Sequence, residues 1–228
     1  MDSQRINELL QPFFTDDASS GLLSEQRSRT EPAALRREQL QQLSSYLDLL
    51  LRWNSRVNLT AVRQPEEIVT RHFGESLFAA RRLFASGAQT NTAQRVIDFG
   101  SGAGFPGLPI KIWVPEIELI LIESNQKKTT FLREVIRTLN LRSTAVFGGR
   151  AEDFDSRAAT VTLRAVERFE ESVRVAERLA VSGGRLALLI GESQIKSARE
   201  VVAGFKWMDP IRIPESLNRV LLVGTAEP

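Results

Sequence analysis

Residues 95–107 read Arg-Val-Ile-Asp-Phe-Gly-Ser-Gly-Ala-Gly-Phe-Pro-Gly, a short apolar run followed at once by closely spaced glycines. This pattern predicts a buried strand that leaves a sheet through a glycine turn into a helix, with Pro106 in the first helical turn. Glycines allow positive φ in such a turn and let a ligand lie against bare backbone. The helix N-terminus adds N–H groups that bind polar or anionic ligand atoms.

A second apolar run, residues 117–122, ends in Glu123, about 16 residues after the last of these glycines. An acid at the end of such a strand accepts hydrogen bonds from two ribose hydroxyls. The order of strand, glycine turn, helix, strand and acid therefore predicts a Rossmann-type sheet that binds an adenosine cofactor.

Two adenosine cofactors fit this pattern. Glycines 102, 104 and 107 satisfy the G-x-G-x-x-G dinucleotide motif, so an NAD-binding oxidoreductase is one alternative. S-adenosyl-L-methionine is favoured by the alternating glycines 100, 102 and 104. It is also favoured by Asp98, whose carboxylate stands at the strand end, where it can orient the turn and meet a cationic amino-acid tail.

The rest of the chain indicates an α/β fold. Further strands are expected at Thr144–Phe147, 160–163 and 185–190, and the helix before the last of them, marked from Val166 onward, should be ended by Gly183-Gly184. Two final extended runs, 205–213 and 218–224, are joined too closely for a crossover helix and should form an antiparallel hairpin. A parallel sheet closed by such a hairpin is typical of the Rossmann-like, seven-stranded methyltransferase architecture, which further favours S-adenosyl-L-methionine.

Two amphipathic helices are expected ahead of this sheet. The first starts near Pro32 and carries an apolar stripe of Leu40, Leu43, Leu47, Leu50 and Trp53. The second starts at Pro65 and runs to about Phe84, and a polar loop, 54–62, separates the two. We therefore expect an N-terminal helical cap over residues 1–90 and a cofactor-binding domain over residues 91–228.

Composition excludes several functional classes. The chain has no Cys and one His, which excludes disulfides, iron–sulfur clusters and cysteine nucleophiles, including methyltransferases that form a cysteine adduct at pyrimidine C5. It also argues against a metal site or a Ser-His-Asp triad, and no metal is expected. A mean hydropathy of −0.16, no apolar run of membrane length and no apolar N-terminal signal segment predict a soluble, cytoplasmic protein without a membrane partner.

Arginine dominates the basic residues, at 25 of the 30 Lys and Arg, while the net charge is only +2. Guanidinium groups match phosphates and stack on bases, so this usage favours an RNA partner. A GC-rich genome, which favours Arg codons, explains it equally well on composition alone.

Several short motifs beyond the glycine turn are more specific. They are Trp53-Asn54, Asn58-Leu59-Thr60, Arg71-His72, Glu123-Ser124, Lys127, Phe131-Leu132, Arg150-Ala151-Glu152-Asp153-Phe154 and Arg164-Ala165-Val166. Together with the glycine turn they cover roughly residues 35–224, and over this stretch the chain resembles the RsmG (GidB) family. These are bacterial methyltransferases that modify N7 of a guanine in 16S ribosomal RNA.

The resemblance implies a set of cofactor-binding residues for S-adenosyl-L-methionine. They are Asp98, Gly100, Ser101, Gly102, Gly104, Phe105, Glu123, Ser124, Ala151, Glu152 and Arg164. Gly100, Ser101, Gly102, Gly104 and Phe105 would line the methionine part and its sulfonium, and Glu123 would hold the ribose. Ala151 and Glu152 would border the adenine, with Glu152 accepting from its amino group. Arg164, at a strand's carboxyl end, would serve the site. The alternatives are an ordinary surface arginine for Arg164 and a solvated acid that opens a short helix for Glu152.

The implied partner is 16S rRNA or the small ribosomal subunit, with Asn58, Arg71, His72 and Arg164 as candidate RNA contacts. For the first three, a purely structural role is the alternative. Guanine N7 has an in-plane lone pair and no proton, so orientation suffices and no catalytic acid or base is named. Arg164 is the first candidate for a donor to the neighbouring O6. A non-catalytic RNA-binding assembly factor is a further alternative, and the modified guanine, the form of the RNA substrate and the oligomeric state stay open.

Three positions depart from the family pattern. Glu123 replaces the usual Asp, and its longer side chain can still reach a ribose diol. Ala159 stands where Asp is common. The fifth strand ends in Leu189-Ile190-Gly191 and lacks the family's Lys. If that Lys contacts RNA phosphate, its loss either weakens RNA binding or shifts the task to Arg185 or Lys196, and the sequence leaves this open.

Overall fold

The computed structural model describes residues 1–15, 34–84 and 94–227. The expected helix start near Pro32 and the expected boundary between cap and cofactor-binding domain near residue 90 fall outside these ranges. The helices are α1 Ser3–Leu10, α2 Arg37–Asn54, α3 Pro65–Glu67, α4 Glu75–Leu83, α5 Gly107–Trp113, α6 Gln126–Thr138, α7 Phe169–Arg178 and α8 Ile195–Val201. Short 3₁₀ turns are η1 Gln11–Phe13, η3 Ala151–Asp153 and η4 Glu192–Gln194, and η2 Ile68–Gly74 is a π-helical segment.

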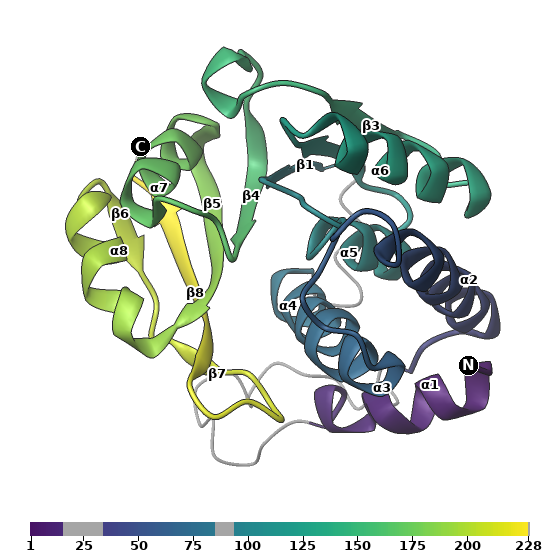
Figure 1. Ribbon diagram of the computed structural model, residues 1–228. Coiled ribbons are helices and arrows are strands. Elements are labelled where there is room, and N and C mark those ends of the chain that lie inside the picture. The colour runs from purple at the N-terminus through teal and green to yellow at the C-terminus, as the bar shows by residue number, and fades with distance from the viewer. Residues whose placement is uncertain (16–33, 85–93, 228) are drawn as a thin grey trace.

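One twisted sheet runs through the molecule in the order β3-β2-β1-β4-β5-β8-β6 (Figure 1). Its strands are β1 Arg95–Phe99, β2 Glu118–Ile122, β3 Thr144–Phe147, β4 Ala158–Arg164, β5 Ala180–Gly191, β6 Phe205–Trp207, β7 Ile211–Arg212 and β8 Arg219–Ala226. Strands β1 to β5 are parallel, and β8 runs antiparallel to β5. The short β7 pairs with β8 beyond β6, so the eight strands fill seven positions and the expected closing hairpin is confirmed.

Helices cover both faces of the sheet (Figure 1). On one face α7 and α8 pack over β4 and β5, and on the other α5, α6 and the N-terminal helices pack over β1 and β2. Successive side chains of β1 point to opposite faces of the sheet. Val96 therefore packs against the face covered by α5, α6 and the N-terminal helices, while Ile97 and Phe99 pack against the face covered by α7 and α8. The N-terminal helices thus share one hydrophobic core with the sheet.

Helix α2 confirms the expected apolar stripe, since Leu43, Leu47 and Leu50 are fully buried. Two polar side chains on the same face were not expected to be buried. Gln39 donates to Ile112 O at 2.8 Å, and Tyr46 donates its hydroxyl hydrogen to Ala103 O. The Gln39 bond joins α2 to α5, and the Tyr46 bond joins α2 to the glycine turn. The two bonds hold the N-terminal helices α1, α2 and α4 against the sheet.

Two element boundaries differ from the sequence-based expectation. Gly183-Gly184 does not end a helix: α7 stops at Arg178, and the two glycines lie inside β5. Ala158 pairs with Ala180 while Thr160 pairs with Arg185, so the residues between form a bulge, with Gly183 at φ +70°. The helix expected over 65–84 is also interrupted by the π-helical η2, which a periodicity of 3.6 does not reveal.

None of the helices within the described ranges is long and apolar enough to cross a membrane.

Candidate functional site

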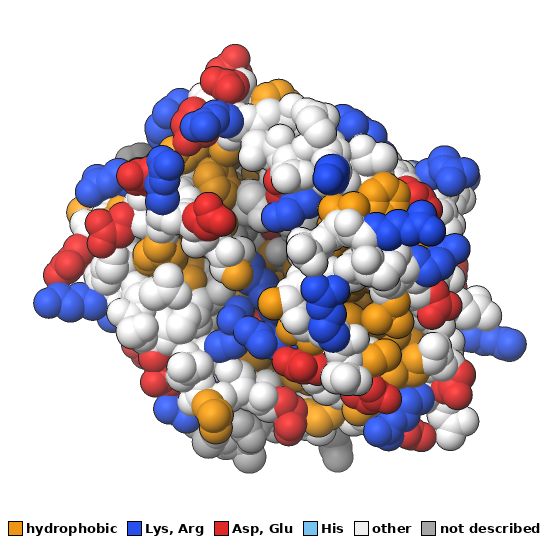
Figure 2. Space-filling model, in the orientation of Figure 1, with side chains coloured by type: hydrophobic (Ala, Val, Ile, Leu, Met, Phe, Trp, Pro, Cys, Tyr) orange, Lys and Arg blue, Asp and Glu red, His pale blue; other side chains and the backbone are white. Residues whose placement is uncertain are grey.

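A hollow of about 290 Å³ opens where the carboxyl ends of β1 and β4 meet the N-terminal helical layer. Its lining residues are Leu59, Thr60, Ala61, Val62, Arg71, His72, Gly100, Ser101, Gly102, Ala103, Phe105, Lys128, Arg164, Ala165 and Arg219. Figure 2 shows this face hollowed near its centre, where Lys and Arg side chains gather. Ligands of open α/β sheets bind at this edge, so the hollow is the candidate site.

The glycine turn forms one wall of the hollow. Gly100, Gly102 and Gly104 have φ values of +63°, +58° and +94°, as the spacing predicted. A Cβ at Gly104 would lie 2.4 Å from Leu108 and 2.6 Å from the Tyr46 hydroxyl, so this glycine is required for packing. A Cβ at Gly102 would meet no atom closer than 3.9 Å. The turn is therefore closely packed at Gly104 and bare at Gly102, which faces open space. This shape fits an adenosine cofactor that lies against the backbone.

Asp98 orients the turn, as predicted. Its Oδ2 accepts from Gly107 N at 3.2 Å, and its Oδ1 accepts from Thr162 Oγ1 at 2.7 Å. The side chain is wholly buried, and burial raises the pKa of Asp98 to about 6 against the opposing effect of these hydrogen bonds. The proposed contact of this carboxylate with a cationic cofactor tail stays a prediction.

Glu123 lies at the carboxyl end of β2, 7% exposed, and closes on the glycine turn. Its Oε2 accepts from Gly102 N at 2.9 Å and its Oε1 from Asn125 N at 2.8 Å. Each oxygen keeps a further lone pair, so the carboxylate can still accept from ribose hydroxyls. Its neighbour Ser124 is exposed.

The expected adenine border, Ala151 and Glu152, forms the 3₁₀ turn η3 after β3. Ala151 is buried and Glu152 is exposed. Neither belongs to the residues that line the hollow, so their contact with a cofactor stays a prediction.

Arg164 is buried at the carboxyl end of β4 rather than on the surface. Its Nη2 lies 3.1 Å from Glu75 Oε2 and donates to Arg71 O at 2.9 Å. Glu75 also forms an ion pair with Arg219, whose Nε lies 3.0 Å from the same Glu75 Oε2. Burial lowers the pKa of Arg164 to about 10, with the Glu75 carboxylate acting in the opposite direction, so the guanidinium stays charged at neutral pH. Its Nε and Nη1 are buried without a hydrogen-bond partner in the described structure.

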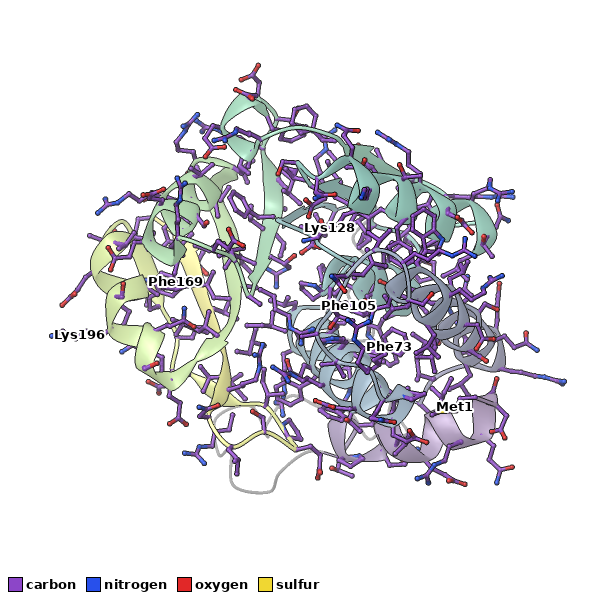
Figure 3. The ribbon with its side chains drawn as sticks, in the orientation of Figure 1. Met1, Phe73, Phe105, Lys128, Phe169 and Lys196 are labelled. Carbon is purple, nitrogen blue, oxygen red and sulfur yellow. The ribbon has the colours of Figure 1, made fainter. Side chains whose placement is uncertain are left out.

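His72 projects from the π-helical η2 into the same hollow. Its ring stacks on Phe105, with centroids 4.9 Å apart, and both nitrogens are engaged: Nδ1 lies 2.9 Å from Arg164 Nη2 and Nε2 lies 2.8 Å from Thr60 Oγ1. Burial and the nearby arginines lower the pKa of His72 to about 2, so the imidazole is neutral. Figure 3 shows Phe105 at the centre of the molecule, with Lys128 to one side of it.

Of the other candidate RNA contacts, Arg71 lines the hollow and Asn58 does not. Arg71 is half-exposed on the rim and pairs with Glu67 at 3.5 Å. Asn58 is exposed outside the lining, where its Oδ1 accepts from Arg63. Trp53 packs between helices, 5.7 Å from the Phe131 ring, and donates to Glu134, which confirms the expected core role.

The family Lys missing from β5 is not replaced by Arg185. That side chain donates to Leu83 O and to Thr160 Oγ1 near the amino end of β4, whereas the hollow lies at the carboxyl end of that strand. Lys196 lies on α8, well apart from Phe105 and Lys128 (Figure 3). The sequence did not predict four residues of the site. Lys128, Arg219 and Thr60 line the hollow, and Glu75 pairs with Arg164 beside it. Only Thr60 carried a signal, since it belongs to the Asn-Leu-Thr motif.

Comparisons with known proteins give a family match and several relatives. The family model described as "GidB: rRNA small subunit methyltransferase G" matches residues 39–207. A protein of Cupriavidus metallidurans is 36% identical over 191 residues, which cover 78% of this chain and 79% of that protein. One of Roseiflexus castenholzii is 37% identical over 202 residues, which cover 83% and 84%. Both are named ribosomal RNA small subunit methyltransferase G.

Solved structures show the same fold at low identity. Magnesium protoporphyrin IX methyltransferase from Synechocystis, with bound SAM, aligns with a TM-score of 0.62 at 13% identity and covers 80% of this chain and 97% of its own. The P. horikoshii protein TYW2 aligns with a TM-score of 0.55 at 18% identity, covering 69% and 63%.

Proposed function

The chain belongs to the rRNA small subunit methyltransferase G family, and on that premise we propose that it transfers a methyl group from S-adenosyl-L-methionine to N7 of a guanine in 16S ribosomal RNA. One observation carries the proposal. A bare glycine turn, to which the buried Glu123 carboxylate is bonded at Gly102 N, lines the same hollow as four basic side chains: Arg71, Lys128, Arg164 and Arg219.

The cofactor side of the hollow is assigned to the glycine turn. The N–H groups of Ser101, Gly102, Gly104 and Phe105 are already bonded within the protein, so the turn offers a ligand mainly the bare Cα surface at Gly102. Glu123 keeps lone pairs for ribose hydroxyls. Asp98, Ser124, Ala151 and Glu152 complete the proposed cofactor set. When bound there, S-adenosyl-L-methionine supplies an electrophilic methyl group on a sulfonium.

The chain's own task is to align the base. Guanine N7 presents an in-plane lone pair and no proton, so rate acceleration comes from proximity and orientation. A histidine base is neither needed nor offered, because both nitrogens of His72 are engaged. Arg164, held by Glu75, and the stacked pair of His72 and Phe105 form rigid walls for the base.

The rim of the hollow is assigned to RNA phosphate. Lys128 and Arg71 lie there as cations, and Asn58 stands on the neighbouring loop. An rRNA or small-subunit substrate places the proposed activity in the cytoplasm. Family membership does not favour an NAD-linked oxidoreductase or an assembly factor without turnover.

The test combines the protein, S-adenosyl-L-methionine and small ribosomal subunits that lack the modification, in parallel with naked 16S RNA. Mass spectrometry of the digested nucleosides should show 7-methylguanosine at one mapped position. Failure to label either RNA form, with RNA binding that weakens steeply with salt, would overturn the enzymatic proposal and select the assembly factor instead.

A further inference from the structure

A chain of polar contacts runs from the buried Glu75 carboxylate to Thr60 at the wall of the hollow. Arg164 Nη2 lies 3.1 Å from Glu75 Oε2 and 2.9 Å from His72 Nδ1, and His72 Nε2 lies 2.8 Å from Thr60 Oγ1. The members come from α4, β4, η2 and the loop after α2, and the side chains of Glu75 and Arg164 are only 4% and 5% exposed. The contacts are therefore fixed by packing from four elements.

The chemistry of Arg164 sets the direction of every hydrogen bond in this chain. A guanidinium only donates, so His72 Nδ1 must accept and carries no hydrogen. The single ring proton then sits on Nε2 and is donated to Thr60 Oγ1. The same oxygen also accepts from Val62 N at 3.2 Å. Both lone pairs of the Thr60 hydroxyl are thus occupied, and its own hydrogen can only be donated elsewhere.

Thr60 is held at the wall of the hollow by its backbone. Asn54, at the end of α2, accepts from Leu59 N at 2.8 Å and from Thr60 N at 3.0 Å. Within the described part of the chain, no protein acceptor receives the hydroxyl hydrogen of Thr60, which lines the hollow. The unpartnered Nε and Nη1 of Arg164 are themselves buried and do not offer the hollow an accessible donor.

We propose that Thr60 is a specificity-determining residue, whose hydroxyl donates to O6 of the guanine presented for N7 methylation, and that Arg164 and His72 are positioning residues that keep it a donor. This inference rests on the proposed function and moves the O6 contact from Arg164 to Thr60. Guanine presents two acceptors on this edge, N7 and O6, whereas adenine presents an amino group beside N7. A hydroxyl whose lone pairs are filled cannot accept from that amino group, so adenine is rejected.

The test is a double-mutant cycle between the protein and the base. Small subunits are reconstituted with 16S RNA that carries either guanine or 2-aminopurine, which lacks O6, at the mapped position. With guanine, Thr60→Val should lower kcat/KM roughly 10- to 100-fold, and Thr60→Ser should restore most of it. With 2-aminopurine, wild type and Thr60→Val should be equally active, because the bond is already absent.

The cycle cancels the intrinsic difference in N7 reactivity between the two bases. Equal penalties for Thr60→Val on both bases would mean a structural role only and would overturn the inference while leaving the proposed function intact. Absence of methyl transfer to guanine by the wild-type protein would overturn the proposed function and this inference with it.

A second measurement needs no RNA. The chain contains one His, so a ¹⁵N-detected imidazole spectrum of the labelled protein reports His72 alone. The Nε2–H tautomer is expected in the wild-type protein, and Arg164→Met should remove the preference for it. A protonated Nδ1 in the wild-type protein would reverse the direction of the contacts and overturn the inference.

Discussion

At the scale of single residues, the site depends on carboxylates that are buried at strand ends. Asp98 carries no exposed surface and accepts from both Gly107 N and Thr162 Oγ1. Hydrogen bonds favour its charged form, but desolvation is the larger effect and raises its pKa from 3.8 to about 6. The carboxylate thus fixes the glycine turn at a cost in stability at neutral pH.

Asp98→Asn should therefore change how stability depends on pH. Between pH 3.8 and about 6 the folded chain binds a proton that the unfolded chain has released, so the contribution of Asp98 is complete below pH 3.8 and is lost as pH rises through 6. The stability of wild type relative to Asp98→Asn should fall by about 3 kcal/mol across this window, at ~1.36 kcal/mol per pKa unit. Urea unfolding at several pH values measures it. The control is Asp155→Asn, because the Asp155 side chain is exposed. If the unfolding free energies of wild type and Asp98→Asn change with pH in parallel, the prediction is refuted.

Glu123 allows a binding prediction. Glu123→Ala removes the proposed ribose acceptor and the contact to Gly102 N, so S-adenosylhomocysteine should bind roughly 10- to 100-fold more weakly, as expected for a hydrogen-bonded charged group at about 1.5–3 kcal/mol. Isothermal titration calorimetry measures the change. The control is Glu118→Ala. Glu118 lies at the opposite, amino end of β2 and pairs with Arg95, so this variant should bind S-adenosylhomocysteine with normal affinity. Unaltered affinity in Glu123→Ala would place the ribose elsewhere.

At the scale of elements, the segment from β1 through the glycine turn to α5 combines two different requirements for glycine. Gly107 has ordinary φ but no room, since a Cβ would lie 2.7 Å from Leu121 Cδ2 and 2.8 Å from Asp98 Cβ. Gly102 has room but a positive φ of +58°. One glycine thus permits the close packing of helix on strand, and the other keeps the surface of the turn bare.

The two glycines should separate stability from cofactor binding. Gly107→Ala overpacks the contact of α5 with β2 and should cost about 1–3 kcal/mol of unfolding free energy. Gly102→Ala should cost about 1–2 kcal/mol through backbone strain alone, yet abolish detectable S-adenosylhomocysteine binding because its methyl group enters the open space of the hollow. Denaturant unfolding and calorimetry on both variants provide the comparison. Normal cofactor affinity in Gly102→Ala would show that this side of the turn does not face the ligand.

At the scale of the whole molecule, the N-terminal helices and the sheet act as one body around the hollow. A single core joins α1, α2 and α4 to β1, β2, α5 and α6, and buried polar bonds from Gln39 and Tyr46 reach across it. The basic residues of the hollow come from both parts, Arg71 from the helical layer and Lys128, Arg164 and Arg219 from the sheet side. Formation of the proposed RNA site therefore requires the complete fold.

The salt dependence of RNA binding should distinguish the basic residues. Lys128→Ala should reduce the slope of log K against log[salt] by about 0.7, the loss of one phosphate contact on single-stranded RNA. Lys196→Ala is the matched control, because its side chain is 86% exposed on α8, away from the hollow, and the slope should not change. Fluorescence anisotropy with 16S RNA across a salt series measures both. An equal loss in Lys196→Ala would indicate a broader RNA surface that includes α8.

Much of the fold was predictable because its signals are local. The run of residues 95–107 fixes strand, turn and helix through apolar burial and glycine φ values, and the strand that follows brings Glu123 to the same edge by the geometry of parallel sheets. The Gly183-Gly184 pair was misassigned for a related reason: glycine marks a break in regular structure, but a helix stop and a strand bulge use the same residue.

The sequence by itself determined the Rossmann-like sheet, the glycine turn and the acid at the end of β2, because each depends on neighbours within one or two elements. Only the tertiary structure decided that Glu75, Arg164, His72 and Thr60 form one chain of contacts, and that Lys128 and Arg219 reach the hollow. A buried ion pair between α4 and β4 leaves no periodic trace in either segment. Its partners are chosen by how the helical layer packs on the sheet, a property of the whole chain.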